Sequence, residues 1–407
     1  MKRSHPTLHL VYAQQILMQL LPITSDAGIL AILCGVCGFF YWLERATKWR
    51  FLTIVPPLVF IYLVPVLLTN TGVLPSKSPV YDKINELVLP VMLLLMLLNV
   101  DVAGAVRVMG RGVIVMLAGS VGVVVGAGVG MFVVQEWVGS TAWKSYGALS
   151  GSWIGGTANL AAVAGALNAT DGDAALAILA DTSIYLVWLP LLLASKRYAA
   201  RFQQFAKVDP ERIARMEEAA EAAAEAPRAA TYRDYLYLLS MATLVAWVSQ
   251  EAAARLPTYE PYLTDKGWLV LLVTTLGLLL ALTPMRRIPA SRDLGMALIL
   301  LFMATMGAKA DLSGVANQAL PFLAGAAICI TVHGLFCFTA AWLLRVDIHT
   351  AAIASAANIG GTATATVVAA HHRESLVPAG IMMALIGYAV GNYGGWLAGV
   401  LCAWISS

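Results

Sequence analysis

The stretch SWIGGTANLAAV, Ser152–Val163, lies between two apolar segments of the chain. Later in the chain, Ala357–Val368 reads ANIGGTATATVV and repeats the same Ile-Gly-Gly-Thr-Ala. Backbone that leaves helical geometry inside a membrane has to be buried in protein or line a wet cavity. Glycine permits sharp turns and close approach of a ligand to the main chain. The repeated motif therefore predicts two breaks in the backbone that serve to hold a solute.

The composition indicates an integral membrane protein. Of 407 residues, 59% are hydrophobic and only 12% are charged, whereas soluble domains carry about 25% charged residues. The net charge of +3 is too small to indicate nucleic-acid binding. Metalloprotease, nucleophile-elbow and Walker A motifs are all missing from the sequence. We therefore expect neither an enzyme nor a pump driven by ATP.

Hydropathy divides the chain into twelve candidate membrane segments, and a polar stretch rich in Ala, Glu and Arg separates them into two sets of six. The segments are 26–44, 51–69, 84–100, 112–135, 145–168, 173–195, 234–254, 267–283, 293–309, 318–344, 349–371 and 375–404. The expected organisation is an N-terminal arm or interfacial helix (1–25), a first membrane repeat (26–195), a cytoplasmic linker (196–233) and a second membrane repeat (234–407).

The two halves are related in sequence around the glycine motif. Aligning the two Gly-Gly-Thr triplets brings Tyr185 near Tyr388, and sets Asn99–Gly104 roughly against Ala308–Gly314. If both glycine segments enter the membrane and return, the halves are inverted; if both cross it, the halves are parallel. Short cytoplasmic loops are enriched in Lys and Arg, and the local basic clusters favour the first alternative. Those clusters are Arg45–Arg50, Arg107 with Arg111, Lys196 with Arg197 and Arg201, and Met285–Arg292.

The predicted fold is therefore an all-α polytopic membrane protein with two inverted repeats, each containing a broken or re-entrant glycine-motif helix. Each leg beside the glycines has about ten residues, or about 15 Å of helix, which is half of a hydrocarbon core about 30 Å thick. Two such tips entering from opposite faces would meet in the middle of the bilayer.

The meeting point suits a charged solute. Helix N-termini carry about half a positive charge and favour an anion or a carboxylate, while unwound carbonyls and hydroxyls suit Na⁺. Packing of small residues between helices is the alternative explanation of the motif. The residues expected to bind the solute are Ser152, Gly155, Gly156, Thr157, Asn159, Asn358, Gly360, Gly361, Thr362 and Thr364.

The chain resembles the YjcL-like family of bacterial membrane proteins, a domain of unknown function. Its glycine motifs also resemble those of the sodium-coupled glutamate and citrate (2-hydroxycarboxylate) transporters. The second resemblance implies inverted repeats, paired re-entrant hairpins and an elevator movement of a transport domain against a scaffold. It carries over only to the matching positions, which are Gly155, Gly156, Thr157, Gly360, Gly361 and Thr362. The citrate type continues with more polar residues where this chain has Thr-Ala, so the substrate stays open.

Asp181 is the main candidate for coupling to an ion, because it lies near the middle of the segment 173–195. An unpaired charge there is costly, so the carboxylate should bind a cation or a proton. The alternatives are a structural partner or a cytosolic vestibule. The second half has no acid in register. The residues expected to take part in coupling are Asp181, Thr182, Tyr185, Tyr388 and Asn392.

Other polar residues in the apolar segments have structural explanations. Asp101 and Asp311 are expected to cap helices. His333 is expected to make an interhelical hydrogen bond in preference to a metal site. Cys34 and Cys37 form a CxxC that no second pair completes, so we expect helix packing there.

The sequence thus predicts a secondary active transporter for a small anionic or carboxylate-bearing organic solute, coupled to Na⁺ or H⁺, with an elevator mechanism. The alternatives are a channel or passive facilitator on the same fold, or a membrane receptor or enzyme that does not transport. The expected partners are the solute, the lipid bilayer and a second copy in a homodimer, without nucleic acid. We expect no metal or cofactor besides the coupling ion, and a location in the bacterial inner membrane.

Overall fold

The computed structural model describes residues 22–47, 49, 57–209, 211, 214–216, 218–219, 228–310 and 315–407, and these residues form helices without any β-strand. Most of the expected N-terminal arm (1–25) lies outside the described residues, as does Asp311. The α-helices are α2 (Asp26–Thr47), α4 (Pro57–Asn70), α5 (Pro79–Leu97), α6 (Val102–Met109), α7 (Arg111–Val134), α8 (Ala142–Gly155), α9 (Thr157–Ala166), α10 (Asp171–Ser195), α11 (Ala199–Ala206), α13 (Tyr232–Ala253), α14 (Asp265–Ala281), α15 (Ser291–Lys309), α16 (Val315–Leu344), α17 (Ile348–His372) and α18 (Val377–Ile405). Three short 3₁₀ turns, η1 (Lys196–Tyr198), η2 (Pro284–Arg287) and η3 (Glu374–Leu376), complete the described helices.

Seven of the described helices are long and apolar enough to cross a membrane, or eight if the bent pair of α5 and α6 counts as one span. The protein is therefore a multi-pass membrane protein, and within its described residues fewer helices meet this length and composition than the twelve predicted segments. Part of the difference has a plain cause: the segment 145–168 consists of two helices of 14 and 10 residues.

The chain forms two compact units, Met1–Glu86 with Leu300–Asp311, and Leu87–Ile299 with Leu312–Ser407. In the smaller unit, α4 contacts the end of α15, because Thr69 Oγ1 donates to the carbonyl oxygen of Ala308 over 2.8 Å. Lys309 at the end of α15 forms an ion pair with Asp82 over 3.5 Å. The larger unit contains both glycine motifs.

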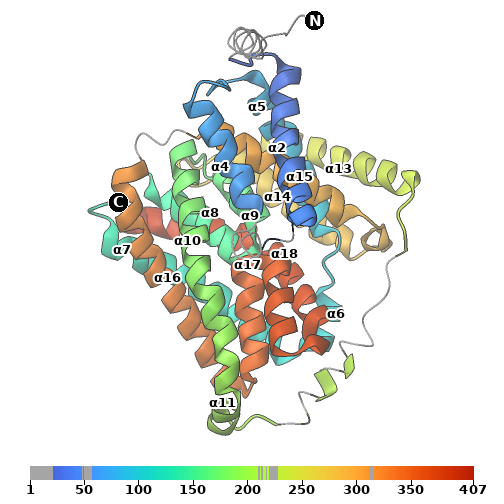
Figure 1. The fold of residues 1–407 in the computed structure, drawn as a ribbon, viewed down its shortest axis with the longest axis vertical. Helices are drawn as coiled ribbons and strands as arrows, with labels where there is room; N and C mark the ends of the chain where they lie inside the picture. The colour runs from blue at the N-terminus through green and yellow to red at the C-terminus, as the bar shows by residue number, and fades with distance from the viewer. Residues whose placement is uncertain are drawn as a thin grey trace, which may run out of the picture. The chain divides into compact units, whose positions relative to one another are not determined.

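An antiparallel pair of long helices, α7 and α16, packs together in the larger unit. At one end Arg111 Nη1 donates to the carbonyl oxygen of Leu344 over 3.2 Å. At the other end the backbone N–H beyond α7, at Gly139, donates to Gln318 Oε1 over 2.7 Å. The beginning of each helix therefore lies beside the end of the other. Figure 1 shows α10 running beside α16 along this pair.

A buried chain of hydrogen bonds ties α10, α17, α16 and α7 together. Trp188 Nε1 donates to Ser355 Oγ over 3.0 Å, and Ser355 Oγ lies 2.9 Å from His333 Nε2. His333 Nδ1 lies 2.9 Å from the carbonyl oxygen of Gly119. A carbonyl only accepts, so Nδ1 carries the proton and Nε2 accepts from Ser355. The expected interhelical hydrogen bond of His333 is confirmed.

The start of α6 confirms one of the two expected caps. Asp101 accepts a hydrogen bond from the backbone N–H of Gly104 over 3.0 Å, and it also pairs with Arg286 over 2.7 Å. One basic residue of the run Met285–Arg292 is thereby neutralised inside the larger unit.

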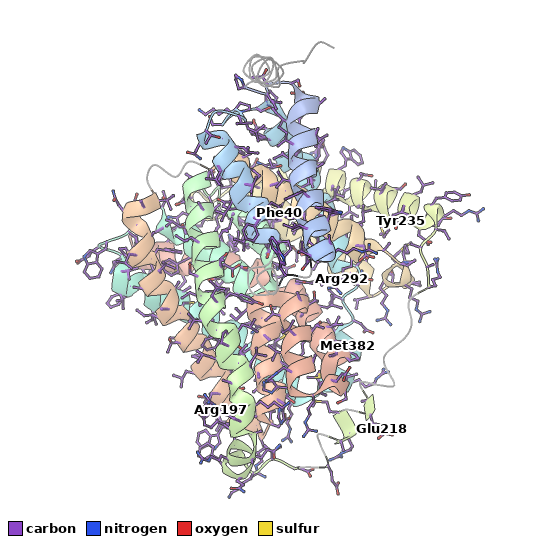
Figure 2. All side chains as sticks on the ribbon, in the orientation of Figure 1. Phe40, Arg197, Glu218, Tyr235, Arg292 and Met382 are labelled. Carbon is purple, nitrogen blue, oxygen red and sulfur yellow. The ribbon has the colours of Figure 1, made fainter. Side chains whose placement is uncertain are left out.

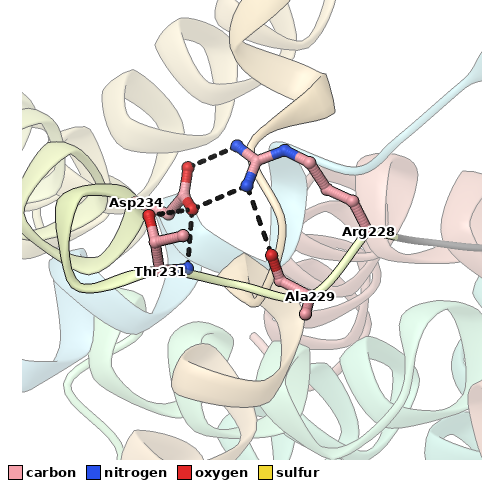
Figure 3. Close-up of polar contacts among 4 residues, drawn as sticks. All are labelled: Arg228, Ala229, Thr231 and Asp234. Atoms are coloured by element: carbon pink, nitrogen blue, oxygen red, sulfur yellow. Dashed lines mark hydrogen bonds and ion pairs between the residues drawn. The ribbon is translucent and has the colours of Figure 1, made fainter.

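The described end of the linker is fastened to α13, as Figure 3 shows. Arg228 binds both carboxylate oxygens of Asp234, with distances of 2.6 and 2.9 Å. The same carboxylate accepts from the backbone N–H and the hydroxyl of Thr231, each over 2.8 Å, and so caps the helix. This bidentate contact holds Arg228 against the first turn of α13.

We expect the substitution Gly126→Ala to destabilise the larger unit by about 1–3 kcal/mol, because added volume in a packed core forces backbone shifts. A Cβ at Gly126 would lie 2.6 Å from the carbonyl oxygen of Cys329 on α16. Gly128→Ala is the matched control, because its Cβ would meet only side-chain atoms of Leu401 and Ile405, at 3.0 Å or more. Thermal unfolding in detergent measures the difference. Equal midpoints for both variants would contradict the close approach of α7 and α16.

Candidate functional site

The helices α8 and α9 form a hairpin, named hairpin 1 from here on. Lys144 Nζ near the start of α8 donates to the carbonyl oxygen of Asn168, just beyond α9, over 2.8 Å. Thr141, immediately before α8, donates to Asp173 at the start of α10, also over 2.8 Å. The chain therefore enters and leaves hairpin 1 at the same end.

The helix α17 also doubles back, and it is named hairpin 2. His349 Nδ1 near its start lies 3.0 Å from His372 Nδ1 at its end. In a straight helix, residues 23 positions apart would be separated by about 35 Å. The turn occurs at Gly361, whose backbone angles are φ 60° and ψ −149°.

The bases of the two hairpins lie at opposite ends of the α7–α16 pair. Hairpin 1 follows α7 and hairpin 2 follows α16, and these two helices are antiparallel. A contact at the C-terminal end of α10 supports this arrangement. Lys196, directly after α10, donates from Nζ to the carbonyl oxygen of His371 at the base of hairpin 2, over 2.6 Å. Hence α10 runs from the base of hairpin 1 to the base of hairpin 2.

The tips of the hairpins meet beside Tyr388 of α18. A Cβ placed on Gly156 would lie 3.9 Å from the Cα of Gly361 and 3.1 Å from Tyr388 Cε1. A Cβ on Gly361 would lie 3.0 Å from Tyr388 Oη. Both glycines are therefore packed against the same aromatic ring, with no room for a side chain that leaves this ring in place.

Both breaks use a backbone conformation that only glycine readily adopts. Gly156 has φ 81° and ψ 178°, and Gly361 has a positive φ combined with an extended ψ. This region is essentially restricted to glycine, and other residues there cost about 1–3 kcal/mol. Each break starts a new helical leg, and the first N–H groups of such a leg have no partner within the helix.

An arginine from outside the hairpins reaches the tip of hairpin 2. Arg292, in the first turn of α15 and labelled in Figure 2, donates from Nη2 to Thr362 Oγ1 over 2.5 Å. Thr362 Oγ1 also lies 3.2 Å from Tyr388 Oη. A guanidinium, two hydroxyls and the N-terminus of a helical leg thus lie together directly after Gly361.

The residues of α10 bind both hairpins. Trp153 Nε1 of hairpin 1 donates to Asp181 Oδ1 over 2.9 Å. Thr364 Oγ1 of hairpin 2 donates to Tyr185 Oη over 3.2 Å. Asp181 and Tyr185 are four residues apart and share one face of α10. Thr182, which was predicted to belong to the same group, is half-buried next to Asp181.

The two asparagines of the motifs fasten the hairpins to neighbouring helices. Asn159 Nδ2 donates to the carbonyl oxygen of Tyr388 over 3.1 Å. Asn358 Nδ2 donates to the carbonyl oxygen of Met116 on α7 over 2.9 Å. Both side chains are buried, so neither amide is open to a solute in this structure.

The remaining predicted residues lie near the tips or face another helix. Ser152 is buried, and its carbonyl oxygen accepts from the N–H of Gly156 over 2.6 Å. Gly155 lies against the backbone of α18, because its Cβ would be 2.5 Å from the carbonyl oxygen of Gly387. Thr157 and Gly360 flank the breaks and are half-buried. Asn392 donates to Thr274 Oγ1 of α14 over 2.8 Å, and no hydrogen bond between Asn392 and Asp181 occurs among the described residues.

Sequence reasoning missed Arg292 and Trp153 as members of the site. In the sequence Arg292 is one member of a basic cluster, and Trp153 is one apolar residue of the stretch Ser152–Val163. Arg292 stands at the start of an apolar segment, which is unusual for a charged residue. This position alone does not predict that Arg292 contacts Thr362, 70 residues later. Within the described residues, no group of three or more His, Cys, Asp or Glu side chains could hold a metal ion.

The fold and site define a multi-pass helical membrane protein in which two hairpins face each other. The chain belongs to the family described as "Protein of unknown function (DUF819)", whose profile matches residues 31–404. It is similar to the "Uncharacterized membrane protein YjcL" of Bacillus subtilis (strain 168), with 28% identity over 355 residues. That match covers 83% of this chain and 87% of the relative. The expected membership of a YjcL-like membrane family is confirmed.

The hairpin geometry predicts a definite labelling pattern for single cysteines in a background without the five native cysteines. Ser140→Cys and Ala169→Cys flank hairpin 1 and should react with a membrane-impermeant maleimide from the same side. Arg201→Cys and Glu374→Cys should react from the other side. All four native side chains are at least partly exposed. Labelling of positions 140 and 169 from opposite sides would show that this segment crosses the membrane.

Proposed function

We propose that this protein is a secondary active transporter that binds a small anionic or carboxylate-bearing solute between the tips of hairpins 1 and 2. One observation carries the proposal: Gly156 and Gly361, each in a backbone conformation restricted to glycine, lie side by side against Tyr388. Such open backbone inside a membrane protein is expected only where it is buried in protein or lines a cavity. Broken helices that direct their N-termini at an anion are a recurring design of transporters.

The proposed architecture has two inverted halves. The antiparallel contacts of α7 with α16, and the opposite positions of the hairpin bases, support this relation. In the first half α7, hairpin 1 and α10 follow one another, and in the second half α16, hairpin 2 and α18 follow in the same order. Rigid movement of these helices against the remaining ones would expose the solute to each side in turn. That movement is the elevator mechanism that the glycine-motif resemblance implies.

The proposed coupling group is Asp181 with its neighbours on α10. Its carboxylate accepts hydrogen bonds from the side chains of Trp153 and Ser152 of hairpin 1, and one turn away Tyr185 accepts from Thr364 of hairpin 2. A cation or proton at Asp181 would therefore change the contacts of α10 with both hairpins. This links occupancy by Na⁺ or H⁺ to the arrangement of the tips, which is what symport requires.

The remaining proposals concern the setting of the protein. We propose that it works in the bacterial inner membrane as a homodimer, and that it is not an enzyme. A channel or passive facilitator is the rival on the same fold. Transport by the proposed carrier saturates and collapses when Na⁺ and H⁺ gradients are removed, whereas passive flux stays linear with concentration.

Substitution of the two break glycines tests the proposed function. In proteoliposomes, Gly156→Ala and Gly361→Ala should each lower the initial uptake rate of a transported carboxylate by about tenfold or more, because strain of at least about 1.4 kcal/mol opposes the occupied tip geometry. Gly165→Ala in α9 is the matched control, because its Cβ would meet only the side chain of Leu89, at 3.2 Å. Uptake that is unchanged in all three folded variants would contradict a solute site between the tips.

A further inference from the structure

We propose that Arg292, together with the hydroxyls of Thr362 and Tyr388, binds a carboxylate of the transported solute and limits the substrates to compounds with a single carboxylate. This inference rests on the proposed transport function and deepens it by naming the substrate class. It is carried by the contacts of Arg292, a residue that neither glycine motif contains.

The first argument is the incomplete set of partners around the guanidinium. Arg292 is half-buried, and its Nη2 donates to the neutral hydroxyl of Thr362 over 2.5 Å. No ion pair of Arg292 occurs among the residues that the structure describes. A guanidinium carries five N–H donors in a planar fork that matches the two oxygens of a carboxylate. The fork therefore has donors left for a carboxylate beside Thr362.

The second argument comes from a neighbouring arginine in the same stretch of chain. Arg286 is partly exposed and is paired with Asp101 over 2.7 Å. Arg292 lies six residues further on, and its Nη2 donates to the neutral hydroxyl of Thr362. A half-buried guanidinium without an acidic partner among the described residues favours an anion that enters and leaves.

The third argument is that the helical leg of hairpin 2 separates Arg292 from the acid of α10. Thr362 and Thr364 are two residues apart, which places them about 200° apart around the helix. Thr362 contacts Arg292, whereas Thr364 contacts Tyr185, on the same face of α10 as Asp181. The leg therefore has a basic side and an acidic side, and Asp181 does not neutralise Arg292.

The charge count gives the substrate class. On the basic side the described contacts provide one guanidinium and two hydroxyls, and the N-terminus of the leg adds about half a positive charge. The positive charge of these groups is sufficient to neutralise one carboxylate. A second carboxylate on the same solute would find no further cation among these contacts, and it would approach the negative charge of Asp181. We therefore expect monocarboxylates to be preferred over dicarboxylates and over uncharged analogues.

The test compares each acid with its neutral amide of nearly the same shape. Proteoliposomes with the full chain are given labelled L-lactate, pyruvate or butyrate, each with or without an excess of lactamide, pyruvamide, butyramide or succinate. In the wild type at least one labelled monocarboxylate should be taken up. The same acid without label should inhibit this uptake at a concentration at least about tenfold lower than the amide or succinate requires. In Arg292→Gln that preference for the acid should fall about 10- to 100-fold, the value of a hydrogen-bonded charge pair.

Two further variants separate recognition from folding. Arg287→Gln changes an exposed arginine of the same stretch and should leave the preference unchanged. Arg292→Lys keeps the charge without the fork and should restore part of the preference. A purely structural role of Arg292 would lower uptake of every solute equally and leave the acid-to-amide ratio unchanged, which would overturn the proposal.

The outcomes distinguish this inference from the proposed function. Saturable, gradient-driven uptake of a labelled acid that the amide or succinate inhibits as strongly as the unlabelled acid does, equally in wild type and Arg292→Gln, would overturn the role of Arg292 while the transporter stands. Failure of the wild type to take up any solute of the panel would overturn the monocarboxylate class. Flux that is linear in concentration and independent of gradients would overturn the transporter itself.

Discussion

The structure depends on the requirement that polar backbone groups inside a membrane must find partners. A continuous helix meets this requirement within itself, whereas a break exposes N–H and carbonyl groups. This chain has breaks at Gly156 and Gly361 and places them against each other and against Tyr388. Packing against Tyr388 and against each other buries Gly156 and Gly361, so the surrounding helices shield both breaks.

The neighbouring helices hold the breaks in place through close contacts. Glycines along α7 allow α16 to approach, as at Gly126, where a Cβ would lie 2.6 Å from a carbonyl oxygen of α16. Each hairpin then uses one asparagine to bind a backbone carbonyl, Asn159 on α18 and Asn358 on α7. The tips are thus positioned by packing and hydrogen bonds at their flanks, which leaves Thr362 and Arg292 to face one another.

Part of this arrangement could be predicted from the sequence, because its cause is local. A repeated Gly-Gly between apolar runs indicates interrupted helices, and a high share of apolar residues indicates a membrane protein. Contacts between distant residues could not be predicted, since hydropathy contains no information on which helices are neighbours. Arg292 with Thr362, and His349 with His372, are such contacts. Hydropathy also does not separate a helix that crosses the membrane from a pair of shorter apolar helices such as α8 and α9, because both are equally apolar.

The most direct measurement of the central claim is a cross-link between the two tips. Cysteines replace Thr157 and Thr362, the first residues after each break, in a chain without native cysteines and with a protease site inserted in the linker. Treatment with a short bifunctional thiol reagent should keep the two halves joined after proteolysis, whereas either cysteine alone should let them separate. Separation of the halves in the double variant, with both thiols shown to be reactive, would contradict the facing tips.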